Sequence, residues 1–265
     1  MLELYHHLIS TCSQKVRLVL AEKGLDFESR EIDLVAGEQH DPEYVKLNPN
    51  HVVPTLIDDG RILIESTLIN EYLDDAYPAL AVRPTQAADR HAMRMWTRRV
   101  DDKVHPFAGV VTYAIGARPL VLQRTPKQIE ASIAAIPDPA RRAARRSVIE
   151  HGVKSPEFAP AISAFVALLD DMEVALETSD WLAGDSISLA DFAVLPYVVR
   201  LDHLAMAPLL TASARPRVAD WYARIGQRPS FASAVTDWAP EPLVSTFQKN
   251  GAEAWADVEP LTRLS

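Results

Sequence analysis

The order of strand-like and helix-like patterns in the first 75 residues constrains the fold more than any other feature. Residues 2–5 alternate in hydrophobicity as a short strand does, residues 14–23 carry apolar side chains at helical spacing, and residues 27–33 alternate again. Gly24 suits the position just beyond a helix, where a left-handed conformation is favoured. A strand, a helix and a strand in this order predict a parallel strand pair joined by a helical crossover.

A second pattern of two strands and a helix follows. Residues 52–57 and 61–64 are rich in β-branched side chains and flank an Asp-Asp-Gly sequence, which is typical of a hairpin turn. From Ser66 onward the apolar spacing becomes helical, with Ser66 as the expected N-cap. Residues 37–50, between the two patterns, are polar and loop-like. We therefore expect an α+β domain of the form βαβ-ββα.

The rest of the chain is predicted to be helical. Residues 79–88 hold two prolines and small side chains, which is typical of a linker, so we expect domains at 1–78 and 89–265. Prolines predict an irregular loop over 116–125 and a break at 137–139. The predicted helical ranges are 89–114, roughly 126–150, 157–178, 188–204 and 215–227.

Composition argues against several classes of protein. The formal net charge of −9 does not fit nucleic-acid binding, which normally needs a basic face. The single cysteine, Cys12, forms no internal disulfide and suits a reducing compartment. The chain begins without the basic start and apolar run of a signal peptide, and it has no stretch of roughly 20 apolar residues. We expect a cytoplasmic protein that binds neither nucleic acid nor membrane.

Three further patterns have structural interpretations. The basic segment ARRAARRS (140–147) is interpreted as a solvated helix face. Ser188 and Asp191 form a predicted capping box that begins a buried helix. The eight histidines show no paired spacing typical of a metal site, so we expect no metal.

Four consecutive hydroxyl or thiol side chains, Ser10 to Ser13, open the first helix. A thiolate at a helix N-terminus is stabilised by the positive helix end and by hydroxyl or amide donors, and these lower a thiol's pKa. Plain helix capping is the alternative. If the segment is a site, the thiol is either that of Cys12 or one brought by a ligand, and the sequence leaves both open.

Two further places have both a binding interpretation and a structural one. A cis bond at Pro54 would leave the Val53 backbone free to pair with a bound peptide, whereas an edge-strand proline needs no ligand. Glu65 and Ser66 precede a helix whose free N–H groups favour an anion. Together they would recognise the ammonium and carboxylate of an amino acid, or Ser66 would act only as a cap.

Four segments together resemble the glutathione S-transferase superfamily over nearly the whole chain. They are STCSQKVRLVLAEKGLDFE, LNPNHVVPTL, ESTLINEYLDDAYP and WLAGDSISLADFAVLPYVVRLD. The resemblance implies a thioredoxin-like domain that binds glutathione, followed by an all-helical domain. It also implies a cytosolic protein that is usually a homodimer.

The resemblance assigns roles at the start of the first helix and in the hairpin. Ser10 matches the catalytic hydroxyl of the serine-type classes, which donates a hydrogen bond to the glutathione sulfur, and Ser13 is the second candidate. Cys12 is a candidate for thiol exchange with a mixed disulfide or conjugate. Val53, before cis-Pro54, is expected to pair with the cysteinyl backbone of glutathione.

The remaining roles concern the two ends of glutathione and the second substrate. Glu65 and Ser66 are expected to hold the γ-glutamyl amine and carboxylate, and His40 and His51 to approach the glycine carboxylate. The second substrate, a small hydrophobic electrophile, is expected between the domains. The residues implied for its pocket are Val104, Phe107, Val111 and Tyr113.

The resemblance extends to several branches of the superfamily. STCSQKVR is similar to zeta-class maleylacetoacetate isomerases and to tetrachlorohydroquinone reductive dehalogenases, although Thr11 replaces the second serine of the zeta pattern. GEQHDPEYVKLNP and RHAMRMWTRRVDD resemble bacterial β-etherases. The tail after Pro229 is longer than that of a minimal transferase, and it is expected either to cover the electrophile site or to pack on the helical domain.

The main hypothesis is a glutathione transferase, in detoxification or the degradation of aromatic compounds. It would activate glutathione as thiolate for attack on an apolar, aromatic electrophile. One alternative is a glutathione-dependent reductive dehalogenase or β-aryl-ether-cleaving enzyme. Another is a non-catalytic binding module with the transferase fold.

Overall fold

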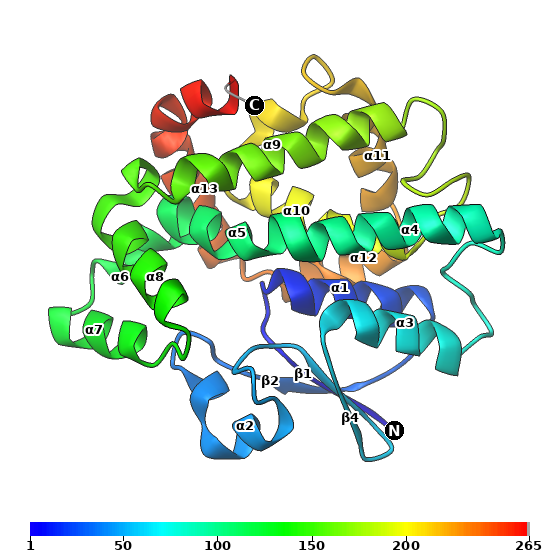
Figure 1. Cartoon of the computed structure of the whole chain (residues 1–265), viewed down its shortest axis with the longest axis horizontal. Helices are drawn as coiled ribbons and strands as arrows, with labels where there is room; N and C mark the ends of the chain where they lie inside the picture. Colours follow the sequence, from blue (N-terminus) through cyan, green and yellow to red (C-terminus); the bar gives the residue numbers. More distant parts are fainter. Residues whose placement is uncertain (264–265) are drawn as a thin grey trace. The chain divides into compact units, whose positions relative to one another are not determined.

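The computed structural model describes residues 1–263 (Figure 1). The chain forms two compact units, each assembled from three separate segments. The first unit comprises Met1–Arg98, Ser179–Pro196 and Trp221–Pro240. The second unit comprises Arg99–Thr178, Tyr197–Asp220 and the segment that starts at Glu241. The predicted division into domains at 1–78 and 89–265 stays a prediction. The last two residues of the predicted second domain, 264 and 265, lie outside the described residues.

The first unit contains a four-stranded mixed sheet with the strand order β2-β1-β3-β4. β1 pairs in parallel with β2 and antiparallel with β3, and β3 pairs antiparallel with β4. The strands are β1 (Leu2–His6), β2 (Glu28–Glu31), β3 (Thr55–Asp58) and β4 (Arg61–Ile64). The helical elements among them are α1 (Thr11–Glu22), η1 (Glu38–His40), α2 (Pro42–Leu47) and α3 (Ser66–Ala76). This arrangement confirms the predicted βαβ-ββα fold.

The hairpin and the crossover both follow from local sequence. Asp59 and Gly60 have φ angles of 45° and 82°, which is the left-handed pair that a tight two-residue hairpin turn requires. Gly24, just after α1, has φ 63° and ends that helix as expected. Leu4 of β1 and Leu56 of β3 are partners in the sheet register and are both fully buried.

The sheet is covered on both faces. α1 and α3 pack against each other on one face (Figure 1). On the other face the ring of Tyr5 in β1 lies 5.9 Å from that of Tyr44 in α2. A fully buried ion pair joins Lys23, the C-cap of α1, to α3, with Lys23 Nζ 2.9 Å from Asp74 Oδ1. Asp74 also accepts a hydrogen bond of 2.8 Å from the Val82 N–H, which ties the segment after α3 to the same core.

Three predicted boundaries in the first unit need correction. Residues 37–50 are not a plain loop, because Pro42 begins α2 and Tyr44 packs into a small apolar cluster. α1 starts at Thr11, three residues before the predicted start, because Ser10 is already the N-cap. Ser66 is the first residue of α3 and not its N-cap, a position that Glu65 occupies.

The late segments of the first unit form a buried hydrogen-bond network. The Ser188 N–H donates to Asp191 Oδ2 at 2.9 Å, as the predicted capping box requires, whereas Ser188 Oγ accepts from the N–H of Ala190 and not from that of Asp191. Trp221 Nε1 and the Leu182 N–H both donate to Asp191 Oδ1, at 2.9 and 3.1 Å. Burial raises the pKa of Asp191, while these hydrogen bonds act to lower it.

Helices make up the rest of the structure. Those divided between the two units are α4 (Ala87–Arg99), α10 (Leu189–His203) and α11 (Pro216–Gly226). The first unit adds α12 (Pro229–Ala234) and η6 (Thr236–Trp238). The second unit holds η2 (Val100–Val104), α5 (His105–Val111), η3 (Thr112–Ala117), α6 (Arg118–Val121), α7 (Pro126–Ala134), α8 (Pro139–His151), η4 (Gly152–Lys154), α9 (Phe158–Ala175), η5 (Ala207–Leu210), α13 (Glu241–Val258) and η7 (Glu259–Arg263).

The second unit differs from the predicted helices in its details. The helix predicted from residue 89 begins two residues earlier, since α4 starts at Ala87. η2 and η3 are π-helical turns that flank α5, and the helical path continues through α6, so the expected loop over 116–125 is confined to 122–125. The expected break near 137–139 is confirmed between α7 and α8.

Close packing within the second unit explains two glycines. A Cβ on Gly116 would meet the side chains of Leu204 and Phe247 at 2.7 to 3.0 Å, and a Cβ on Gly251 would overlap the Leu204 carbonyl. α13 therefore packs directly against η3 and the backbone of Leu204. In the part of the chain that the structure describes, no helix combines the length and the apolar character needed to cross a bilayer.

Candidate active site

Ser10 occupies the N-cap of α1, with φ −64° and ψ 126°. Its Oγ accepts a hydrogen bond of 3.3 Å from the Ser13 N–H. Because this oxygen acts as the acceptor, the Ser10 hydroxyl proton is left to donate to another group. Ser10 is half-buried, so a ligand can reach it at the positive end of the helix.

The neighbours of Ser10 differ in accessibility. Ser13 is fully buried, and its hydroxyl accepts a hydrogen bond of 3.2 Å from the His7 N–H. This geometry favours Ser10 over Ser13 as a donor to a ligand. Cys12, the second residue of α1, is half-buried.

Arg17 holds the segment that leads into Ser10. This side chain is almost fully buried, yet among the described residues no carboxylate pairs with it. Its guanidinium instead donates to the carbonyls of His7 and Leu8, at 3.2 and 2.7 Å, and to Ala234 O at 2.8 Å. The backbone just before the N-cap is therefore fixed by a buried cation that is satisfied by carbonyl oxygens.

The same guanidinium determines the protonation of His6. Arg17 can only donate, so His6 Nδ1, 2.9 Å away, is an acceptor, and the ring proton lies on Nε2, which donates to Ser29 Oγ at 2.8 Å. Burial, and then the charge of Arg17, lower the pKa of His6 to about 3. His6 is therefore a neutral structural group, and sequence reasoning assigned it no such role.

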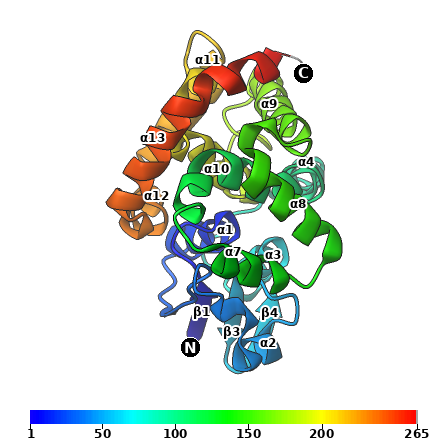
Figure 2. The same ribbon diagram turned by 90° about the vertical axis from the view of Figure 1, so that its left-hand side faces the viewer.

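The carboxy-terminal tail covers this cluster. Trp238 lies with its ring centroid 5.1 Å from Arg17 Cζ and 4.7 Å from the His6 ring. α12 lies beside α1 in both views (Figures 1 and 2), and Ser230 Oγ donates to Glu22 Oε2 at 2.7 Å. Within the first unit, the first part of the tail thus packs on α1, next to the segment that leads to Ser10.

The Val53–Pro54 peptide bond is cis. Among residues 1–263, neither the N–H nor the C=O of Val53 has a hydrogen-bond partner, so both can pair with a ligand. The preceding turn is held by Tyr44, whose hydroxyl donates to Val52 O at 2.7 Å, and by Asn48, whose amide donates to the same oxygen at 2.9 Å. Sequence reasoning missed Asn48, although the Asn-Pro-Asn sequence signals such a turn.

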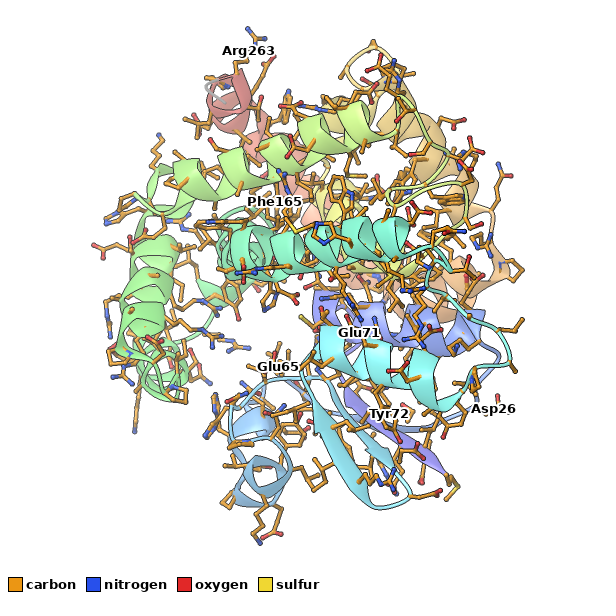
Figure 3. The ribbon with its side chains drawn as sticks, turned by 45° about the vertical axis from the view of Figure 1, so that its right-hand side comes forward. Asp26, Glu65, Glu71, Tyr72, Phe165 and Arg263 are labelled. Carbon is orange, nitrogen blue, oxygen red and sulfur yellow. The ribbon has the colours of Figure 1, made fainter. Side chains whose placement is uncertain are left out.

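Glu65 lies where β4 ends and α3 begins (Figure 3). Its φ of 69° is unfavourable for a residue with a side chain, and strain of this kind clusters at binding sites. Asn50 Nδ2 donates to Glu65 Oε1 at 3.2 Å, so this residue, also missed from the sequence, helps to orient the carboxylate. Ser66 follows as the first residue of α3, where the helix N–H groups favour an anion.

His40 and His51 form a pair, with their Nδ1 atoms 3.1 Å apart. The Gln39 amide nitrogen lies 3.0 Å from His40 Nε2 and donates to it, so His40 carries its proton on Nδ1 and donates to His51. His51 then presents an Nε2–H as a donor. Burial, followed by the neighbouring His51, lowers the pKa of His40.

The structure brings the predicted residues of the first unit together in two places. The hairpin side contains the hydrogen-bonded pair His40 and His51, and also Val53 and Glu65, whose carboxylate accepts from Asn50. The helix side contains Ser10, and α1 meets the start of α3 through a hydrogen bond of 2.8 Å from Lys15 Nζ to Thr67 Oγ1. The His51 Nε2–H and the N–H groups at the start of α3 are possible donors to an anion, and the Glu65 carboxylate is a possible acceptor.

The four residues predicted for the second substrate differ in accessibility. Val104 and Val111, seven positions apart, are 1% and 0% exposed and belong to the core of the second unit. Phe107 and Tyr113 are half-buried and keep accessible ring surface. The geometry therefore favours Phe107 and Tyr113 over the two valines as contacts for a substrate.

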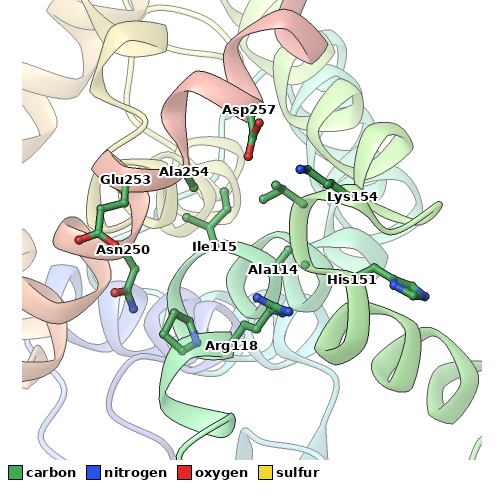
Figure 4. A pocket seen from close by; sticks show the side chains of 12 residues that line it. Ala114, Ile115, Arg118, His151, Lys154, Asn250, Glu253, Ala254 and Asp257 are labelled. Atoms are coloured by element: carbon green, nitrogen blue, oxygen red, sulfur yellow. The ribbon is translucent and has the colours of Figure 1, made fainter.

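A pocket of about 420 Å³ lies within the second unit (Figure 4). Its walls combine the cations of Arg118 and Lys154 with the carboxylates of Glu253 and Asp257. None of its lining residues was predicted from the sequence as a site residue. In the described part of the chain, no three side chains of His, Cys, Asp or Glu gather in a way that could hold a metal ion.

A thioredoxin-like sheet with a cis-proline, a capped helix carrying a serine and an all-helical remainder define the class of glutathione-binding transferases. Comparison with protein-family models agrees. The amino-terminal glutathione S-transferase domain matches residues 4–82, and the carboxy-terminal glutathione S-transferase domain matches residues 128–224. The chain belongs to the glutathione S-transferase family, whose co-substrate is glutathione.

Individual relatives cover most of this chain. The glutathione S-transferase TCHQD of Arabidopsis thaliana is 27% identical over 88% of this chain and 89% of its own length. Protein LigF of a Sphingobium strain is 30% identical over 86% and 91%. The tetrachloro-p-hydroquinone reductive dehalogenase of Sphingobium chlorophenolicum is 28% identical over 87% and 94%. The crystal structure of the β-etherase LigF superposes with a TM-score of 0.78 over 88% of this chain and 98% of that one.

Proposed function

We propose that this chain catalyses attack of glutathione thiolate on an apolar, aromatic electrophile. The observation that carries the proposal is the half-buried Ser10 hydroxyl at the N-cap of α1, oriented by the Ser13 N–H and preceded by a segment that Arg17 holds in place. When bound, glutathione supplies the nucleophilic sulfur. Ser10 donates a hydrogen bond to that sulfur, and the start of α1 stabilises its negative charge, so the thiol ionises near neutral pH.

The hairpin side orients the peptide. Val53 pairs with its backbone, Glu65 accepts from its ammonium, and Ser66 at the start of α3 donates to the neighbouring carboxylate. His51 donates its Nε2–H to the carboxylate at the other end, with His40 behind it. These contacts place the sulfur at Ser10 and convert a bimolecular attack into a step within one complex.

The electrophile is proposed to contact Phe107 and Tyr113. In the reaction a C–S bond forms at the electrophilic carbon, the bond to the leaving group breaks, and that group departs with the electron pair. The thiol proton passes to water. The similarity to a β-etherase, in sequence and in structure, supports a substrate that carries an aryloxy leaving group.

Enzyme kinetics with chlorodinitrobenzene and glutathione tests the proposal. Ser10→Ala is expected to lower kcat/KM by roughly ten- to hundredfold, the equivalent of one charge-assisted hydrogen bond. Thr11→Ala is the matched control, since it removes the adjacent hydroxyl, and it is expected to change kcat/KM less than threefold. Full activity in Ser10→Ala would contradict the assignment of Ser10 as the donor to the sulfur. Failure of the chain to bind glutathione would favour a transferase fold without catalytic activity.

The alternative of reductive dehalogenation rests on Cys12, which is half-buried two residues after Ser10. In that reaction the Cys12 thiolate attacks the sulfur of the glutathione conjugate, an S–S bond forms, and the ring carbon leaves with the electron pair and is protonated. A second glutathione then reduces the mixed disulfide. A glutathione adduct on Cys12, seen by mass spectrometry during turnover of a halogenated hydroquinone, would favour this alternative, and its absence would count against it.

A homodimer in the cytoplasm is proposed on the basis of the family. The single cysteine is consistent with a reducing compartment. Light scattering after size-exclusion chromatography tests the assembly, and a mass equal to one chain would contradict it.

A further inference from the structure

The basic segment of α8 is not a uniformly solvated face. Arg142 donates to the carbonyls of Ile136 and Pro137, at 2.6 and 2.9 Å, and thereby closes the turn before the helix. Arg146 pairs with Glu130 of α7. Arg141 is exposed. The fourth arginine, Arg145, is half-buried and points elsewhere.

Arg145 lies over the ring of Tyr113. Its Cζ is 3.3 Å from the ring centroid, and a terminal nitrogen comes within 3.8 Å of where a side chain on Gly109 would begin. Gly109 belongs to α5 and Tyr113 to η3, so the guanidinium covers the helical surface that carries the proposed substrate contacts. All three residues belong to the second unit.

The charge of Arg145 has no anionic partner. Among residues 1–263, no carboxylate lies within ion-pair distance of its guanidinium, in contrast to Arg146 on the next position. Burial lowers the pKa of Arg145, and Tyr113 acts in the opposite direction. A half-buried guanidinium whose partners are the ring and the hydroxyl of Tyr113 is an incomplete anion site, because its planar set of N–H donors matches a carboxylate or phenolate.

We propose that Arg145 is a specificity-determining residue that selects aromatic electrophiles bearing an anionic group, a carboxylate or a phenolate. The proposal rests on the proposed function, since it places the substrate at Tyr113. The aromatic ring of the substrate packs beside Phe107 and Tyr113, and its anion meets the N–H edge of Arg145. An aryl compound that is neutral but otherwise identical gains the packing without the charge-assisted hydrogen bonds.

The test compares two electrophiles that differ only in charge, chlorodinitrobenzoate and chlorodinitrobenzamide. In both, the glutathione sulfur bonds to the ring carbon, the C–Cl bond breaks, and chloride leaves with the electron pair. The wild-type protein is expected to prefer the carboxylate. Arg145→Gln is expected to lower kcat/KM for the carboxylate by roughly ten- to hundredfold and for the amide by less than threefold.

Two further variants serve as controls. Arg141→Gln removes an exposed charge from the same helix and is expected to leave the preference unchanged. Arg145→Lys keeps the charge but loses the planar pair of donors, so it is expected to fall between the wild type and Arg145→Gln. The proposal would be overturned if Arg145→Gln lost the same activity toward both electrophiles, or if Arg141→Gln abolished the preference for the carboxylate.

A binding measurement separates this proposal from the proposed function. Calorimetric titration with dinitrobenzoate and dinitrobenzamide, which lack the leaving group, reports recognition without catalysis. Tighter binding of the benzoate that disappears in Arg145→Gln would support the anion site even if neither chlorinated compound reacts. Equal affinity for the two analogues in the wild-type protein would refute the anion site even in an active transferase.

Discussion

Trp238→Ala is expected to destabilise the first unit by about 2 to 4 kcal/mol. The ring supports Arg17 by a cation–π contact worth roughly 1 to 2 kcal/mol at a partly buried site. It also contacts the rings of His6 and Phe27, with centroids 4.7 and 6.4 Å away, and each such contact contributes roughly 0.5 to 1.5 kcal/mol. Trp238 is half-buried, which keeps the total at the lower end of what a tryptophan deletion costs.

Urea unfolding of the full chain, followed by circular dichroism, measures the effect. Trp238→Phe retains a ring over Arg17 and is expected to recover at least half of the lost stability. Trp238→Ala should also raise the KM for glutathione. The reason is that Trp238 supports Arg17, which holds the carbonyls just before Ser10. A change in unfolding free energy below about 0.5 kcal/mol for Trp238→Ala, the range of ordinary surface substitutions, would refute this reasoning.

Three further changes have defined outcomes. Asp74→Ala leaves the buried Lys23 ammonium without its partner, and a loss of about 3 to 5 kcal/mol is expected in urea unfolding, whereas an effect under 1 kcal/mol would contradict the buried pair. The pKa of His6 is about 3 in the folded chain and near 6.5 in the unfolded chain, so unfolding takes up a proton between pH 3 and 6.5. The free energy of unfolding should therefore fall by about 1.4 kcal/mol per pH unit as the pH decreases through this range. His6→Gln should reduce this dependence of the unfolding free energy on pH. Gly251→Ala places a methyl group on the Leu204 carbonyl and should lower the melting temperature markedly; an unchanged melting temperature would show that α13 packs less closely.

The topology of the first unit could be predicted because its signals are local. Strand alternation, an Asp-Gly turn and a glycine after α1 each depend on a few neighbouring residues. α2 was missed for the same reason, since its six residues include only one buried side chain, Tyr44, and show no helical period. The N-cap of α3 was misplaced because only the backbone reveals that Glu65 adopts a positive φ.

The roles of charged and apolar residues in the site depend on contacts that the sequence does not show. Arg17 resembles a solvent-facing helix charge, yet it donates to the Ala234 carbonyl, 217 positions away. Arg145 belongs to a basic run that is typical of a solvated face, yet it covers Tyr113. Val104 and Val111 came from a resemblance in sequence, which does not distinguish a pocket wall from the core behind it.

The pKa of the glutathione thiol in its complex with this chain tests the central claim most directly. The ultraviolet absorbance of the thiolate, followed against pH, gives this value for the wild-type protein and for Ser10→Ala. The bound thiol is expected to have a pKa below that of free glutathione, and Ser10→Ala to raise it by about 1 to 2 units, the equivalent of one hydrogen bond to a charged sulfur. The same pKa in both proteins would contradict the assignment of Ser10 as the group that stabilises the thiolate.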